Sequence, residues 1–110
     1  MKFEDLKKFI DIEEERLKKC YVYPEKDKRI LAHAVKLGEE VGELYDEVLA
    51  KIGLQRKEKA GEYSDESLAE ECADIFIVTM LLANSLNINV ENALIKKIEK
   101  IEERHKNNNC

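Results

Sequence analysis

Two acidic pairs with the same spacing are the residues of this chain best suited to act together chemically. Glu40 and Glu43 form one pair, and Glu71 and Asp74 form the other. On a helix, residues three apart share a face with Cβ atoms roughly 5–6 Å apart, so each pair can direct two carboxylates at one point. Four converging carboxylates repel one another, and a divalent cation removes that repulsion. Because Mg²⁺ prefers oxygen ligands, the pattern predicts a magnesium site, with Mn²⁺ as the alternative ion.

Each pair also has a plain structural interpretation. Glu39, Glu40 and Glu43, taken alone, would suit the solvated face of a surface helix. Asp74 fits that interpretation poorly, since it lies in the strongly apolar run 72–83, where an unpaired carboxylate is costly. The two pairs together therefore favour metal binding.

Apolar residues recur at helical spacing in four segments, which must position these acids. The residue before Pro24 avoids the α region, and Gly53 provides a helix stop. Ser64 or Asp65 is expected to cap the third helix, and Asn89 the last. The predicted helices cover residues 3–19, about 26–52, about 66–86 and 90 to about 105. The charged loop 54–65, with Arg56, Lys57 and Lys59, is either a mobile connection or a segment that closes over phosphates.

Two glycines, Gly38 and Gly42, fall inside the second predicted helix. Each costs about 1 kcal/mol relative to alanine in a helix interior. Their four-residue spacing suggests that another backbone approaches closely there, and the alternative is that both are simply tolerated.

The third predicted helix is apolar on nearly every side. Between residues 72 and 83 only Asp74 and Thr79 are polar. A helix of this kind is buried on nearly every side, and three other short helices cannot easily surround it. We therefore expect an all-α, four-helix bundle-like fold that assembles through this helix, as a homodimer or a dimer of dimers.

Composition limits the other possibilities. With 110 residues the chain is expected to form one domain, with a disordered tail over 106–110. The net charge of −5 argues against nucleic acid and anionic membranes as partners. Three cysteines without a C-x-x-C pair, and an N-terminus unlike a signal peptide, lead us to expect a cytoplasmic protein.

The acidic runs resemble a known family, the MazG-like all-α nucleoside triphosphate pyrophosphohydrolases. Residues 37–44 and 70–75 match the family pattern of E-E-x-x-E followed by E-x-x-D, and the resemblance covers about residues 25–105. It implies hydrolysis of a nucleoside triphosphate to the monophosphate and pyrophosphate. The resemblance further implies that Mg²⁺ is held by Glu40, Glu43, Glu71 and Asp74. Glu39 or Glu43 is the expected residue for activating water.

The last helix carries part of the family's substrate-binding pattern. Lys97 and Arg104 match the family's lysine and arginine, but Ile101 stands where asparagine is usual, which puts the usual base or sugar contacts in doubt. Because Lys97 and Arg104 do match the family pattern, they are expected to contact phosphates. The alternative is a basic, solvated stripe that complements the C-terminus of the helix.

Two further residues, His33 and Lys36, precede Glu40 by seven and four positions and so share its helix face. They are candidate contacts to the nucleotide, although a histidine packed for structural reasons is common.

Two other classes of protein share some of these features. A di-iron carboxylate bundle requires two internal Glu-x-x-His motifs, whereas this chain has one, Glu102 to His105, near its end. A non-catalytic nucleotide-binding or oligomerisation module on the same frame is the other alternative, and the substitution at Ile101 favours it.

Overall fold

The computed structural model describes residues 1–22, 25–54 and 63–107, which form four helices and no strand. The helices are α1 (Phe3–Cys20), α2 (Lys26–Lys51), α4 (Asp65–Ser85) and α5 (Val90–Lys106). The prediction of an all-α chain is confirmed, and each helix begins and ends within one residue of its expected bounds. Helix α5 reaches one residue into the expected tail. Most of the charged loop, residues 55–62, and the last three residues lie outside the described part of the chain.

The helix ends use the capping residues that the sequence indicated. Ser64 caps α4, its Oγ accepting a 3.0 Å hydrogen bond from the Ser67 amide. Asn89 caps α5 in the same way, its Oδ1 accepting from the Asn92 amide at 3.0 Å. After α2, Gly53 adopts φ 77°, a left-handed conformation that favours glycine.

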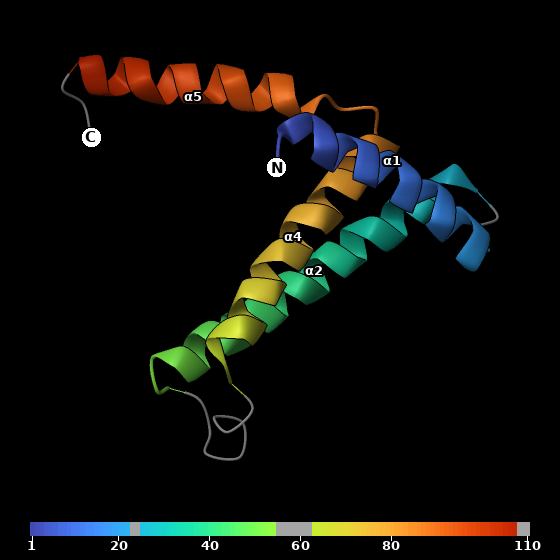
Figure 1. Ribbon diagram of the computed structural model, residues 1–110, viewed down its shortest axis with the longest axis horizontal. Helices are drawn as coiled ribbons and strands as arrows, with labels where there is room; N and C mark the ends of the chain where they lie inside the picture. Colours follow the sequence, from blue (N-terminus) through green and yellow to red (C-terminus); the bar gives the residue numbers. More distant parts are fainter. Residues whose placement is uncertain (23–24, 55–62, 108–110) are drawn as a thin grey trace.

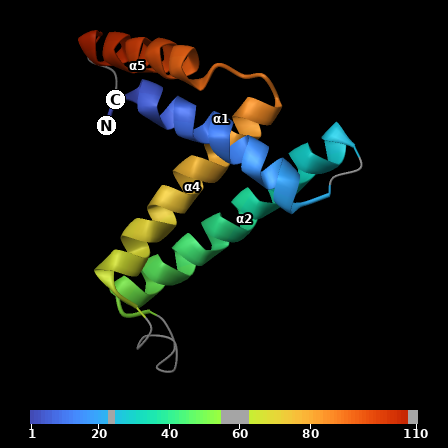
Figure 2. The same ribbon diagram turned by 45° about the vertical axis from the view of Figure 1, so that its right-hand side comes forward.

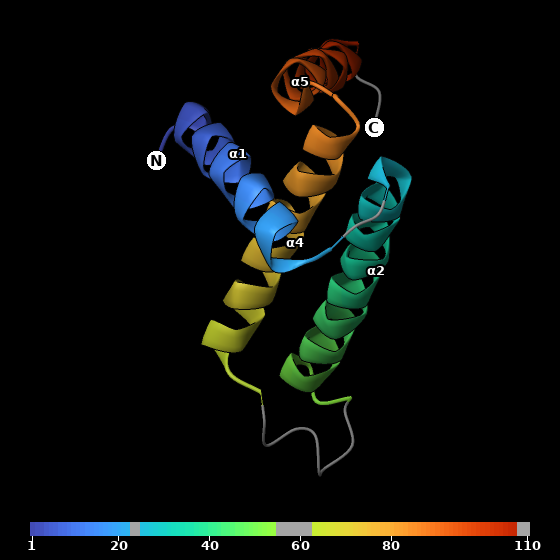
Figure 3. The same ribbon diagram turned by 90° about the vertical axis from the view of Figure 1, so that its right-hand side faces the viewer.

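Helices α2 and α4 form the central unit, an antiparallel pair lying side by side (Figures 1 and 3). Helix α1 crosses α4 near its C-terminal half, and α5 projects away from the pair (Figure 1). The radius of gyration is 17.4 Å, against roughly 13 Å for a compact domain of about this size. A single chain therefore brings α1, α2 and α4 together but leaves α5 outside a closed bundle.

The buried apolar core lies where α1 meets α4. Among the described residues it consists of Ile10 from α1 with Val78, Leu81 and Ala83 from α4. Within the described residues, no single helix is both long and apolar enough to cross a membrane. Helices α4 and α5 have the required length and apolar composition only when they are taken together, across a bend of 113°.

The two glycines inside α2 have open space around them. A Cβ atom added at Gly38 or Gly42 would meet nothing within 4 Å. Within this chain, the interpretation that another backbone approaches them closely is therefore wrong.

Replacing Gly38 by alanine should raise the free energy of unfolding by about 1 kcal/mol, because alanine costs less conformational entropy in a helix interior. Urea denaturation of the Gly38→Ala variant measures this. Gly53→Ala is the matched control and should destabilise the protein, since Gly53 has a positive φ. Destabilisation by Gly38→Ala would instead indicate that a second molecule packs against this position.

Candidate metal centre

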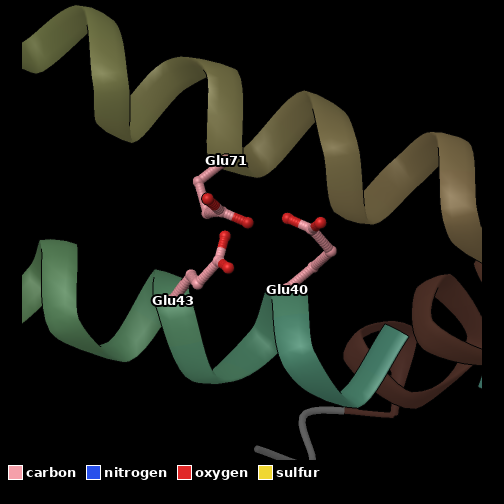
Figure 4. Close-up of side chains that lie close together, drawn as sticks. All are labelled: Glu40, Glu43 and Glu71. Carbon is pink, nitrogen blue, oxygen red and sulfur yellow. The ribbon is translucent and has the colours of Figure 1, made fainter. Parts of the chain in front are cut away.

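Three carboxylates meet between α2 and α4. Glu40 and Glu43 project from α2 toward Glu71 on the facing helix α4 (Figure 4). One oxygen from each residue lies within 4.8 Å of the others. The three-residue spacing places the two α2 acids on one face. The antiparallel pairing of α2 with α4 then brings the third acid opposite them.

Two of these carboxylates are buried and incompletely bonded. Glu40 is 6% exposed and Glu71 is 9% exposed, whereas Glu43 is open to solvent. Among the residues that the structure describes, Glu40 Oε2 and Glu71 Oε1 are buried without a hydrogen-bond partner, as are Glu14 Oε2 and Arg29 Nε elsewhere. A buried oxygen without a partner loses its hydration and gains nothing in return. The donor set, all carboxylate oxygen, suits a hard divalent cation that would supply the missing contact.

The fourth predicted ligand, Asp74, lies beside this cluster but not within it. It is exposed, one helical turn beyond Glu71 on α4, and lines a cavity together with Glu40. Its oxygens do not belong to the group that lies within 4.8 Å. The structure thus brings three of the four predicted ligands into close contact and places the fourth at the edge of the adjoining cavity.

Lys36 places a cation next to the cluster. Its Nζ lies 3.1 Å from Glu40 Oε1 and 3.7 Å from Glu39 Oε2. Its hydrogen bond to Glu40 raises the pKa of Lys36 above its usual value. Glu39 itself, with its side chain 59% exposed, does not belong to the group of three clustered acids.

A cavity of about 430 Å³ adjoins the carboxylates, between α1, α2 and α4. Its lining combines charged groups with apolar side chains. The charged residues are Glu13, Lys36, Glu40 and Asp74, and the others include Leu17, Tyr21, His33, Ile77, Val78 and Leu81. Ligand pockets in proteins are commonly about 300–1,000 Å³, so the space is large enough for a small molecule.

Residues 29–108 match the family model described as the MazG nucleotide pyrophosphohydrolase domain. The chain belongs to this family. A curated relative, "Uncharacterized protein YpjD" of Bacillus subtilis (strain 168), is 41% identical over 76 residues, which is 69% of this chain and 67% of that protein. No solved structure matches the chain significantly.

In this MazG domain, the pKa values of the two buried acids are shifted in opposite directions. A hydrogen bond to Glu40, burial and then the nearby Glu43 raise the pKa of Glu71 to about 8. The hydrogen bond from Glu71 lowers the pKa of Glu40, against the opposing effect of burial, and Lys36 lowers it further. Near neutral pH the metal-free centre therefore carries a proton on Glu71, and a bound cation would displace that proton.

The predicted nucleotide contacts have different surroundings. His33 is buried, and its Nε2 lies 3.4 Å from the carboxylate of Glu14 on α1, while its ring also lines the cavity. Lys97 and Arg104 are exposed on α5, which projects away from the α2–α4 pair (Figures 1 and 2). The structure of one chain does not bring them to the carboxylates.

Sequence reasoning missed a third buried carboxylate, Glu14, which pairs with Arg29 at 3.0 Å. The run of glutamates at 13–15 resembles a solvated helix face. One signal could have revealed it, because Glu14 follows Ile10 by four residues and precedes Leu17 by three. It therefore occupies a position on the apolar stripe of α1.

The stability of the metal-free protein should fall as pH rises from about 4.5 to about 8. Folding raises the pKa of Glu71 from its ordinary 4.5 to about 8. The contribution to stability is full below the unfolded value and is lost as pH rises through the folded value, because the folded protein keeps a proton that the unfolded chain releases. Urea denaturation in chelator across this range measures the slope.

The Glu71→Gln variant should lack this part of the slope and should be more stable than the parent above pH 8, since glutamine cannot ionise. Glu70→Gln changes the adjacent exposed glutamate and is the matched control, which should keep the parent slope. If the parent and Glu71→Gln lose stability equally as pH rises, Glu71 does not retain a proton near neutral pH.

Proposed function

We propose that this MazG domain hydrolyses nucleoside triphosphates to the monophosphate and pyrophosphate in a reaction that requires Mg²⁺. The observation that carries the proposal is the convergence of Glu40, Glu43 and Glu71, two of them with buried oxygens that lack a partner, beside a cavity of suitable size. Membership of a pyrophosphohydrolase family supports the same reaction class.

Glu40, Glu43 and Glu71 would hold the cation, with Asp74 completing the ligand set from the edge of the cavity. Mg²⁺ is the preferred ion and Mn²⁺ the alternative, because all the donors are carboxylate oxygens. When bound, the ion would neutralise phosphate charge and polarise the water that attacks the α-phosphorus.

The chain's own residues would position and deprotonate that water. Glu43 is the exposed member of the cluster, so it can reach both the cation and the solvent side of a bound triphosphate. Glu39 is the second candidate for the base, on the outer face of α2. Lys36, which pairs with Glu40, would turn toward a phosphate as the ligand enters.

The predicted contacts of Lys97 and Arg104 with the substrate would require a second copy of the chain. Phe76 on α4 is 69% exposed, and Ile98 on α5 is 56% exposed. Exposed apolar surface of this kind marks interaction sites. A second copy of the chain that covers these residues would form a homodimer or a dimer of dimers. Such an assembly would give Lys97 and Arg104 of α5 a route to a site that one chain leaves distant.

Purified protein should release pyrophosphate from nucleoside triphosphates with Mg²⁺ and not in chelator. Glu71→Gln and Asp74→Asn should each lower the rate by on the order of 100-fold, because each removes a negative ligand from the centre. Glu70→Gln, the neighbouring exposed glutamate, should keep the parent rate. A panel of ribo-, deoxy- and modified triphosphates identifies the base and sugar that the enzyme prefers.

Thermal melting separates the possible outcomes of this assay. Full activity in Asp74→Asn would exclude Asp74 as an essential ligand, and lost activity with a collapsed melt would make it structural. Nucleotide binding by the parent protein without pyrophosphate release would instead identify a non-catalytic nucleotide-binding module.

The protein should have a mass in solution of at least twice 12.8 kDa. Phe76→Glu should shift the mass toward that of the monomer, because a buried interfacial charge is costly. Lys19→Glu, a charge change on the exposed surface of α1, is the control and should leave the mass unchanged. Light scattering at micromolar concentration measures both, and a parent mass near 12.8 kDa would refute the assembly.

A further inference from the structure

Glu14 forms a buried polar centre at the meeting point of three helices. Its side chain is on α1 and is 4% exposed. Its Oε1 accepts a 3.1 Å hydrogen bond from Ser85 Oγ on α4, and lies 3.0 Å from Arg29 Nε on α2. His33 Nε2, also on α2, lies 3.4 Å from the same carboxylate. A single carboxylate on α1 thus contacts both helices that carry the clustered acids.

A buried carboxylate is costly unless its charge and hydrogen bonds are matched. Here Arg29 supplies the opposite charge, and Ser85 and His33 supply polar contacts. The match depends on how α1 lies against α2 and α4, since the partners come from both. Glu14 therefore specifies the position of α1 more strictly than the neighbouring apolar contact of Ile10 does.

The position of α1 matters because α1 forms one wall of the cavity beside the carboxylates. Glu13 and Leu17 of α1 and Tyr21, the residue that follows this helix, line the cavity, opposite Lys36 and Glu40 of α2 and the apolar side chains of α4. Helix α1 also lies outside residues 29–108, the part of the chain that matches the MazG domain. The wall is therefore a feature of this chain beyond the matched domain.

We propose that Glu14 is a positioning residue that docks α1 so that Leu17 and Tyr21 close a cavity for the base and sugar of the nucleotide. The inference rests on the proposed function, because it places the phosphates at the carboxylates that border the same cavity. The apolar walls, Leu17 from α1 and Ile77 from α4, suit the flat face of a base. Lys36 suits the phosphate end directly, whereas Asp74 would meet the phosphates only through the bound cation.

The test compares Glu14→Gln with Glu15→Gln, the same change one residue along α1. Glu15 is exposed and pairs only across the surface with Lys18, at 3.1 Å. Glu14→Gln should raise KM for nucleoside triphosphates about tenfold and leave kcat within about twofold, because the cavity wall shifts while the carboxylate cluster stays intact. Glu15→Gln should change neither constant.

A second variant, Leu17→Ala, removes part of the wall while leaving the contacts of Glu14 in place. It should also raise KM. Binding of inorganic tripolyphosphate with Mg²⁺ should be unchanged in both variants, since this ligand has no base or sugar to enter the cavity. All measurements are made well below the melting temperature of each variant.

The outcomes separate a positioning role from a structural one. If Glu14→Gln lowers only the melting temperature and leaves KM at the parent value, the inference is wrong and Glu14 is merely structural. Equal weakening of nucleotide and tripolyphosphate binding would also overturn it, because the effect would then lie at the carboxylates.

Methyl NMR with the α,β-methylene analogue of ATP distinguishes an error in the inference about Glu14 from an error in the proposed function. One outcome is that the parent protein binds the analogue without turning over nucleotides. If the analogue then shifts the Leu17 methyl signals and Glu14→Gln abolishes that shift, the positioning role of Glu14 holds although the protein is not an enzyme. Binding that leaves Leu17 unaffected overturns the inference alone, and no nucleotide binding at all overturns both proposals.

Discussion

The structure depends on a conflict between two buried carboxylates that face each other across the α2–α4 pair. Glu40 and Glu71 have oxygens within 4.8 Å of one another, and within the described part of the chain each keeps a buried oxygen without a hydrogen-bond partner. Two like charges in a poorly solvated space destabilise the fold, and the chain offsets this with Lys36 and with a retained proton. Both are partial remedies, since Lys36 is half exposed and the proton is lost in mild alkali. A divalent cation would neutralise both carboxylates, so the repulsion between Glu40 and Glu71 supports metal binding at this site.

Comparison with Glu14 shows why an acidic residue in a helix can have either of two roles. Glu14 is as deeply buried as Glu40, yet it has an arginine, a serine and a histidine around its carboxylate. Arg29 pairs with its charge at 3.0 Å, and this pairing fits a residue that fixes helix positions. Glu14 Oε2, like Glu40 Oε2, nevertheless has no hydrogen-bond partner among the described residues. Glu40 and Glu71 are clustered with a third acid, Glu43. The nearby cation, Lys36, is half exposed, so this cluster fits residues that await a ligand. The partners of a buried carboxylate therefore indicate its role better than its burial or its place in an acidic run.

The sequence predicted the helices closely because local rules determine them. Apolar periodicity, the caps at Ser64 and Asn89, and the left-handed turn at Gly53 all act within a few residues. The convergence of Glu40 and Glu43 with Glu71 needed one further step, the antiparallel pairing of two consecutive long helices, which a short connection favours. What escaped prediction was long-range. The contact between Glu14 and Ser85 spans 71 residues, and no local pattern reveals it.

The other departures have the same origin. The spacing of Gly38 and Gly42 suggested a close backbone, but spacing alone does not say which face of a helix meets a neighbour, and both glycines face open space. Asp74 shares a helix face with Glu71, yet the spread of that face and the side-chain conformation leave its oxygens outside the close cluster. Periodicity fixes a residue on a face to within about a third of a turn, whereas metal ligation depends on differences of less than an ångström.

Helix α5 carries both exposed apolar residues that a partner could bury and two cations that the substrate site would need. Four apolar residues are buried among those described, while Phe76 and the apolar stripe of α5 remain exposed. A small core gives a small hydrophobic contribution to stability, which a second copy would increase by covering these surfaces. The same α5 carries Lys97 and Arg104, which one chain holds apart from the carboxylates. In the proposed assembly, the burial that stabilises the domain and the delivery of cations to the triphosphate would both depend on where α5 docks. Selection for a stable interface and selection for a complete substrate site would then act on the same helix.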